Sequence, residues 1–412
     1  MTILDGIYQR TATQQHKHGS NFDNRIAGPE FSVLPRLLKC PSVCPNDDRR
    51  RLPFVISNLN SYSGMSEISG TGLRLLSFDG GGFRGLSSLF VLEEIMQRIR
   101  AERGDNVEPW QCFDMIGGTS MGGLIGIMLG RLRMPLKEAI ERYIQLTQKV
   151  LRETKYGWQD GRFKATFLEE AVKEIVRDYS ELKDEETRLL DTRPDSCKVF
   201  VCAMSAANMR ASIPTHFRTF AAYENVSANC KIWEAVRATS AHPEFFKRIK
   251  IQDVGLQVEY IGGEIGCNNP TRRVLTEANR IFRGAHIACL ISIGTGEGEA
   301  IKMPEPGLKE NTIPLETLGV LKQIATDCEE TQQKVEAKFE RFKRGDSDPG
   351  VYFRFNLDQV PGDTQRWEAV GEAIVESTKK YIEIVDNARR VEGAATAIRR
   401  REPRVLLSEA AR

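Results

Sequence analysis

A serine between two glycines is the group in this chain whose setting most directly suggests chemistry. Residues 118–122 read GTSMG, a GxSxG pattern, between a short apolar run and an apolar helical run at 124–132. On a sharp strand-to-helix turn a serine presents its hydroxyl above the sheet, and the flanking positions must be small because the backbones crowd there. The pattern predicts a nucleophile, Ser120, on an elbow formed with Gly118 and Gly122. The alternative is a turn whose serine only caps the helix.

A second glycine cluster lies earlier in the chain, where residues 79–85 read DGGGFRG. Its GxGxxG spacing allows three interpretations: a dinucleotide-binding turn, a tight turn for which glycine is merely permissive, or an anion hole. In an anion hole, backbone N–H groups at a helix N-terminus point outward and stabilise a developing oxyanion, and an arginine in the loop adds positive charge. The candidate residues of this loop are Gly80, Gly81, Gly82, Arg84 and Gly85.

The two clusters together favour acyl transfer over hydride transfer. A donor-rich loop at one strand end and a nucleophile elbow at the next supply the two groups that acyl transfer needs. A dinucleotide site would need an acidic residue about 20 positions after the glycines, at the end of a second strand. That region is predicted to be helical, with Glu102 as its nearest acid. Nucleotide binding is therefore the weaker alternative.

Short apolar strands that alternate with helices must position these loops. The expected strands are 73–78, 113–116, 198–204, 217–223 and 286–293, and the expected helices include 86–99, 124–132, 136–180 with one break, and 232–240. This alternation predicts an α/β fold of three layers, with a central, mostly parallel sheet between helices. We expect three segments: a weakly ordered lead-in at 1–70, the main domain at 71–300, and a helical C-terminal extension at 301–412 with one edge strand at 351–357.

The composition limits the class of protein. Hydrophobic residues make up 41% of the chain and charged residues 28%, which is typical of a soluble globular protein. The 58 basic and 56 acidic side chains leave a formal net charge of +2, so nucleic acid is not an expected partner. No apolar run reaches the roughly 18 residues of a membrane span, and no secretory signal is evident, so a cytoplasmic location is expected. Nine cysteines with one close pair, Cys40 and Cys44, predict neither a disulfide framework nor a zinc site, and no metal is expected.

In five blocks the sequence resembles the patatin-like phospholipase family. The order and spacing of the blocks are also those of the family, and the resemblance covers roughly residues 71–300. The lead-in and the C-terminal third resemble, more loosely, the extensions of fungal members. The blocks are LLSFDGGGFRGLSSLFVLEEI (75–95), FDMIGGTSMGGLIGIML (113–129), IWEAVRATSAHPEFF (232–246), YIGGEIGCNNP (260–270) and ISIGTG (291–296).

The resemblance implies a lipid acyl hydrolase that uses a Ser–Asp dyad and no cofactor. It implies that Ser120 forms an acyl-enzyme and that the glycine loop, chiefly Gly81 and Gly82, supplies the oxyanion hole. Asp79 would then be a structural acid of the loop and not its base. The implied substrate is a lipid or phospholipid, and peripheral contact with membranes follows from that substrate. The arginine-rich stretch 389–404 is either a contact for anionic lipid or, as we favour, a solvated helix face.

The sequence departs from the family where the second catalytic residue is expected. Counting back from the Asn-Asn-Pro block puts the family's aspartate at position 262, which is glycine here. Glu264 could substitute, but two extended residues span about 6.6–7 Å, and the extra methylene of Glu recovers only about 1.5 Å. Asp253 is another candidate base. The alternative to a hydrolase is therefore a catalytically inactive protein that binds lipid or has a regulatory role.

The five histidines do not predict an ordinary triad. His286 opens a strand at the end of the sheet opposite the elbow, so a triad through it is geometrically awkward. The others are interpreted as polar or half-buried side chains: His16, His18, His216 and His242.

Overall fold

The computed structural model describes most of the chain after residue 69. The described residues are 70–104, 106–155, 161–209, 214–222, 229–253, 255–296, 323, 326–345, 348–357 and 367–412. The predicted lead-in, with His16, His18 and the Cys40/Cys44 pair, lies outside the described residues.

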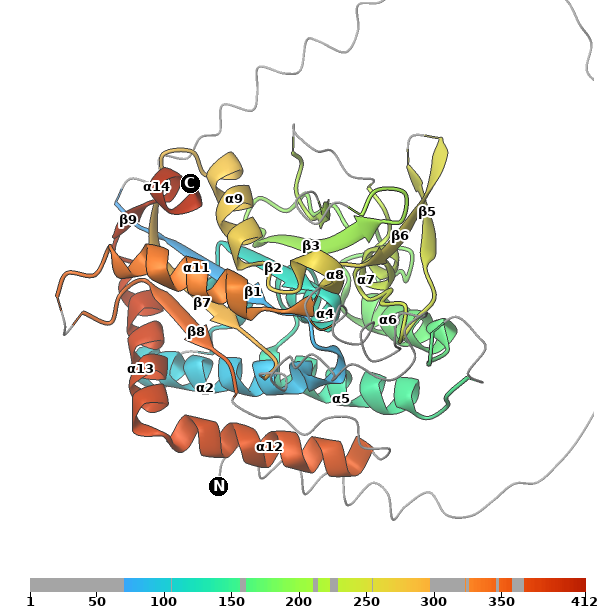
Figure 1. Cartoon of the computed structure of the whole chain (residues 1–412), viewed down its shortest axis with the longest axis horizontal. Coiled ribbons are helices and arrows are strands. Elements are labelled where there is room, and N and C mark those ends of the chain that lie inside the picture. Colours follow the sequence, from blue (N-terminus) through green and yellow to red (C-terminus); the bar gives the residue numbers. More distant parts are fainter. Residues whose placement is uncertain are drawn as a thin grey trace, which may run out of the picture. The chain divides into compact units, whose positions relative to one another are not determined.

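One mixed sheet forms the centre of the described unit (Figure 1). Its main order is β5-β6-β3-β2-β1-β7-β8, with β4 paired to β3 and β9 paired to β7. The pairs among β3, β2, β1, β7 and β8 are parallel, which confirms the predicted, mostly parallel sheet. The strands are β1 (Leu73–Phe78), β2 (Met115–Thr119), β3 (Lys198–Ser205), β4 (Thr215–Arg218), β5 (Ile249–Asp253), β6 (Leu256–Gly262), β7 (His286–Ile293), β8 (Tyr352–Phe355) and β9 (Val405–Leu406).

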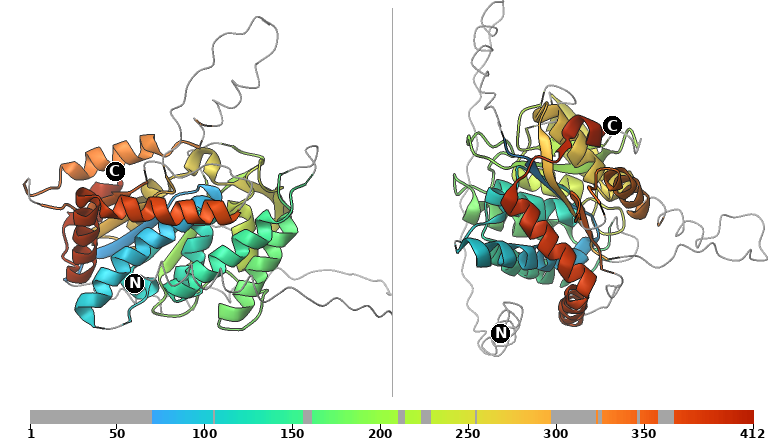
Figure 2. Two further views of the ribbon diagram at one scale, coloured as in Figure 1. Left: turned by 90° about the horizontal axis from the view of Figure 1, so that it is seen from below. Right: turned by 90° about the vertical axis from the view of Figure 1, so that its left-hand side faces the viewer.

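Helices cover both faces of this sheet, as predicted (Figures 1 and 2). The face above the sheet in Figure 1 carries α9 (Thr271–Ile281), α11 (Glu329–Glu340) and α14 (Leu407–Ala411). The elements of the other face are α2 (Gly85–Arg103), α4 (Ser120–Gly126), α5 (Leu136–Leu151), α6 (Ala165–Tyr179), α7 (Ile232–Thr239), α12 (Trp367–Glu383) and α13 (Val385–Arg400). Shorter helices are η2 (Gly82–Arg84), α3 (Pro109–Cys112), η3 (Ile127–Arg131) and α8 (Glu264–Cys267).

Burial on both faces explains why the central strands are apolar without alternation. All six residues of β1 are buried, including Arg74. Strands covered by helices on both sides lack a solvent face, so they do not alternate between polar and apolar residues. Between the sheet and α9, Leu75 and Met115 pack with Val274 in one core cluster, to which Phe339 of α11 also belongs.

The predicted and observed elements agree best where an apolar run has clear ends. β1 and β7 have the predicted bounds, whereas β2 is shifted to 115–119 and includes Gly117 and Gly118. Glycine is required at position 117, because a Cβ there would lie 2.5 Å from Cγ2 of Val274 and 2.7 Å from Cζ of Phe200. The strand expected at 217–223 is found at 215–218, and the β5–β6 hairpin and α9 were not predicted.

The segment after residue 300 joins the same sheet. β8 lies at its edge, parallel to β7, as the alternating pattern at 351–357 predicts. Helices α12 and α13 pack against α2 (Figure 2). Residues on both sides of position 300 belong to one compact unit. The predicted division into a main domain at 71–300 and an extension at 301–412 therefore stays a prediction.

Candidate active site

Ser120 lies on a sharp turn at the carboxyl end of β2. It is the first residue of α4, and its φ of +54° is in the left-handed region that favours glycine. A non-glycine residue there costs on the order of 1–2 kcal/mol, so the surrounding contacts must hold it. The Ser120 N–H donates to Oγ1 of Thr239 at 2.8 Å, and that hydroxyl donates to the Cys202 carbonyl at 2.6 Å. The turn has the geometry expected of a nucleophile elbow.

The two glycines of the motif are required by close backbone contacts. A Cβ on Gly118 would lie 2.5 Å from the carbonyl oxygen of Gly122, and a Cβ on Gly122 would lie 2.3 Å from the carbonyl oxygen of Asp79. Real Cβ atoms essentially never approach so closely. The second contact also shows that the elbow lies against the start of the glycine loop.

The carbonyl groups of the glycine loop are held by side chains. The Gly80 carbonyl accepts from Oγ1 of Thr295 at 3.1 Å, and the Gly82 carbonyl accepts from the Tyr143 hydroxyl at 3.1 Å. Gly81 and Gly82 have φ values of +150° and +59°, which glycine adopts without strain. The loop conformation therefore depends on partners from α5 and from the end of β7.

The backbone N–H groups of this loop differ in whether the described residues supply an acceptor. The Gly80 N–H donates to the Asn268 carbonyl at 3.0 Å, and the Gly85 N–H bonds back to Gly82 and Phe83. Among the described residues no acceptor is recorded for the N–H groups of Gly81 and Gly82. An oxyanion hole built from this loop would use those two amides.

Arg84 lies in the same loop and is partly exposed. Its Nε is 3.4 Å from the Gly81 carbonyl. Burial lowers the pKa of Arg84, and the charge of Glu264 opposes that shift. The guanidinium is thus a positive charge beside the two available amides.

Asp79 anchors the loop to the C-terminal part of the sheet. Its side chain is 1% exposed, and its Oδ2 lies 2.6 Å from Nη2 of Arg354 in β8. Arg354 also donates to Ser292 at 2.8 Å and to Gln332 at 2.9 Å. Burial raises the pKa of Asp79 and Arg354 opposes the rise. This buried pair suits the structural role that the family resemblance implies for Asp79.

Position 262 lies beside the elbow and carries no side chain. The Gly263 N–H donates to the Thr239 carbonyl at 3.2 Å, and the same threonine holds the Ser120 N–H. The Gly262 N–H donates to the Ala241 carbonyl at 2.9 Å. The structure thus brings positions 120 and 262 together around Thr239, which the sequence analysis did not single out although it lies in the 232–246 block.

Glu264 packs onto the glycine loop. It is 5% exposed, and a Cβ on Gly80 would lie 2.7 Å from its Cγ and 3.2 Å from its Oε1. Its Oε1 is buried without a hydrogen-bond partner among the described residues, and its Oε2 lies 4.0 Å from Nε2 of His242. The other candidate base, Asp253, has a side chain outside the described part of the structure.

The remaining described histidines lie in other settings. His216 is buried 3.2 Å from Glu277, which also binds Arg218. His286 is exposed at the first residue of β7, the end of that strand opposite the glycine loop. Among the described histidines, His242 is therefore the one close to a carboxylate of the candidate site.

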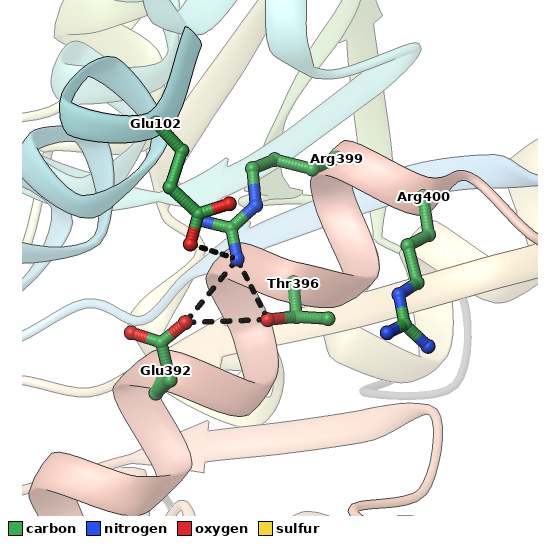
Figure 3. A pocket seen from close by; sticks show the side chains of 5 residues that line it. All are labelled: Glu102, Glu392, Thr396, Arg399 and Arg400. Atoms are coloured by element: carbon green, nitrogen blue, oxygen red, sulfur yellow. Dashed lines mark hydrogen bonds and ion pairs between the residues drawn. The ribbon is translucent and has the colours of Figure 1, made fainter.

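The C-terminal arginines are more involved in structure than the predicted solvated face implies. A surface pocket of about 470 Å³ lies between α2 and α13, and Figure 3 shows the side chains that line it. Within it, Arg399 is 2.9 Å from Glu102 and 3.2 Å from Glu392. Arg401 binds Asp114 at 2.6 Å, and Arg404 pairs with Asp348. Neutralising partners hold these side chains against the protein, whereas Arg400, 3.8 Å from the exposed Glu402, is itself largely exposed.

Comparisons with known proteins identify the family that residues 76–275 match. Residues 76–275 match the family model described as patatin-like phospholipase. The chain contains a domain of this family. Among the described residues no cluster of three or more His, Cys, Asp or Glu could hold a metal ion. No helix in the described ranges is long and apolar enough to cross a membrane.

Individual relatives carry phospholipase and patatin names. Human calcium-independent phospholipase A2-gamma is 29% identical over 337 residues, which cover 77% of this chain and 39% of that protein. Phospholipase A I of Arabidopsis thaliana is 27% identical, covering 69% and 24%. Probable inactive patatin-like protein 9 of the same plant is 25% identical, covering 57% and 63%. The chain thus spans well under half the length of the first two relatives.

Proposed function

We propose that this chain is a serine lipid acyl hydrolase of the patatin type and that Ser120 is its nucleophile. The observation that carries the proposal is the strained Ser120 at the tip of β2, packed against a loop in which two amides have no recorded acceptor among the described residues. Glycine-only contacts at positions 118 and 122 support it, because they allow the elbow and the loop to touch. The phospholipase names of the relatives point to the same class of reaction.

The proposed reaction proceeds through an acyl-enzyme. Oγ of Ser120 attacks the carbonyl carbon of a fatty acyl ester, and the carbonyl oxygen becomes an oxyanion that accepts from the amides of Gly81 and Gly82. Removing one such donor typically costs about 2.7–4 kcal/mol of transition-state stabilisation. Water then releases the fatty acid. Ser120 is 4% exposed, which suits a nucleophile shielded from bulk water.

The proposed substrate is a phospholipid or neutral lipid, met at a membrane surface from the cytoplasmic side. Peripheral contact follows from that substrate, because acyl chains are presented in aggregates. The largely exposed Arg400 is a candidate for electrostatic contact with anionic lipid.

An inactive lipid-binding or regulatory protein is the second candidate. The specific observation in its favour is Gly262, which leaves no carboxylate at the position beside the elbow. A serine hydroxyl is a weak nucleophile without an adjacent base. The relative named as probably inactive shows that the family name alone does not guarantee catalysis.

Labelling by a fluorophosphonate probe, combined with ester turnover, separates the two candidates. We expect labelling of the wild-type chain, loss of labelling in Ser120→Ala, and unchanged labelling in the control Ser408→Ala, a partly exposed serine of α14. Release of fatty acid from phosphatidylcholine vesicles should follow the same pattern. Vesicle binding without labelling or turnover would instead establish the inactive protein.

A further inference from the structure

Within the described part of the chain, one carboxylate oxygen of Glu264 has no hydrogen-bond partner. The side chain is 5% exposed, and Oε1 is buried without a hydrogen bond among the described residues. Buried polar atoms in native proteins almost always have a partner, because an unpaired one loses its hydration without compensation. A buried carboxylate oxygen without a hydrogen-bond donor indicates that it binds a proton or a donor group during function.

Glu264 lies between the support of the nucleophile and the glycine loop. Its neighbour Gly263 donates to Thr239, which accepts from the N–H of Ser120. On its other side, the Glu264 side chain lies where a Cβ of Gly80 would be. The residue therefore follows directly on backbone that is bonded to Thr239, and its side chain lies against the glycine loop.

His242 faces the second oxygen of this carboxylate. Nδ1 of His242 lies 3.3 Å from the backbone N–H of Glu244, which donates to it. A neutral ring that accepts at Nδ1 carries its proton on Nε2, and Nε2 is the atom 4.0 Å from Oε2 of Glu264. The ring thus turns its N–H toward Oε2 and leaves Oε1 open.

We propose that Glu264 is the general base for Ser120, in place of the carboxylate missing at position 262, and that His242 is its positioning residue. The inference rests on the proposed function. As the bond from Oγ to the acyl carbon forms, the Ser120 proton moves to Oε1 and the carbonyl π electrons move to the oxygen. When the bond to the leaving alcohol breaks, Glu264 returns that proton to the alcohol oxygen. In the second half, Glu264 takes a proton from water and returns it to Oγ.

The charges around Glu264 suit this transfer. Arg84 and Tyr143 both lie within the electrostatic influence of its carboxylate. Burial, and then Glu264, raise the pKa of Tyr143, so its neutral hydroxyl keeps donating to Gly82. When the proton moves, negative charge leaves the carboxylate and appears on the oxyanion beside the same loop. Because the proton moves within the site, the site does not gain net charge, and the Nε of Arg84 lies 3.4 Å from the Gly81 carbonyl of the same loop.

Restoring an aspartate at position 262 is a poorer test than changing Glu264 itself. A Cβ on Gly262 would lie 2.9 Å from the backbone nitrogen of His242 and 3.2 Å from the Thr239 carbonyl oxygen. The added side chain would therefore displace the histidine that faces Glu264. Glu264→Gln keeps the size of the side chain and removes only its ability to take a proton.

The test measures the second-order rate of fluorophosphonate labelling of Ser120 across a pH series. For Glu264→Gln we expect a rate lower by about 10²- to 10⁴-fold at neutral pH, the usual contribution of a general base. The matched control is Glu259→Gln on β6, which is paired with Arg248 near the surface and should label like wild type. His242→Gln should label at an intermediate rate.

The pH series adds a readout that a purely structural role would not move. The titratable groups facing Glu264 are His242, Arg84 and Tyr143. If Glu264 must be ionised to accept the proton, wild-type labelling falls as the pH is lowered, and Glu264→Gln loses that dependence. Glu264→Asp keeps a carboxylate and should retain part of the rate. If Glu264→Gln does not fold, the labelling rate of Glu264→Asp and the pH dependence of wild-type labelling still test whether Glu264 is the base.

Two different failures can be distinguished. Wild-type labelling at Ser120 that is matched by Glu264→Gln would overturn this inference and leave the proposed function standing. An absence of any labelling in a folded, lipid-binding wild-type chain would overturn the proposed function, and this inference with it.

Discussion

The buried pair between Asp79 and Arg354 makes a sharp prediction about how the segment after residue 300 supports the active-site loop. Asp79 follows β1 directly and leads into the glycine loop, while Arg354 lies in β8 at the edge of the sheet. The perturbation is Arg354→Met, which keeps a long side chain and removes the guanidinium. Asp79 is then left buried without its counter-ion.

The expected loss of stability is about 3–5 kcal/mol, the usual cost of removing one partner of a buried ion pair. Exposed pairs are typically worth only about 0–1 kcal/mol. The larger figure applies because Arg354 and Asp79 have side chains that are 6% and 1% exposed. Ser292 and Gln332 also lose the donor that Arg354 supplies to them.

Urea unfolding at a series of pH values measures this loss. Burial raises the pKa of Asp79, and Arg354 opposes that rise, so the variant should raise it further. The folded variant then binds a proton more tightly than the unfolded chain. Its free energy of unfolding should therefore increase as the pH falls through the range between the unfolded and folded pKa values, and the deficit relative to wild type should shrink.

The double variant Asp79→Asn/Arg354→Met is the control. It removes both charges, so it should recover most of the loss. A deficit below about 1 kcal/mol, or a deficit in Arg354→Met that does not change with pH, would refute the reasoning that this pair holds the loop.

Three further variants test the elbow and a second buried cluster. Gly122→Ala places a Cβ 2.3 Å from the Asp79 carbonyl oxygen, so it should cost about 1–3 kcal/mol and nearly abolish labelling of Ser120. Gly126→Ala in the same helix places its Cβ 3.2 Å from Cγ2 of Ile116 and not against backbone, so it should label almost normally; equal labelling of both variants would contradict the crowding argument. Burial opposes the charge of Glu277, but hydrogen bonds from His216 and Arg218 outweigh it and lower the pKa of Glu277. The stability that this lowered pKa provides is present above the unfolded pKa and is lost as the pH falls through the folded pKa. Glu277→Gln should therefore be less stable near neutral pH, and its free energy of unfolding in urea should change less as the pH is lowered.

The sequence alone was enough for features that depend on neighbouring residues. A buried strand between clear breaks reads as a short apolar run, and 73–78 and 286–293 were found with the predicted bounds. The GxSxG pattern predicted the turn at Ser120, because a sharp strand-to-helix turn admits only small flanking residues. The hairpin of β5 and β6 was missed because its residues mix polar and apolar types, as at Lys250 and Gln252.

Only the tertiary structure decided which distant groups meet at the site. Thr239 joins Ser120 to the turn at 262–263, and Arg354 reaches Asp79 from a strand far along the chain. Such contacts depend on the order of strands in the sheet, which places the ends of β1, β2 and β6 near one another. No local pattern in the sequence encodes that order. Spacing along the chain could therefore show that position 262 lacks a carboxylate, but only the packing showed that Glu264 lies against the glycine loop.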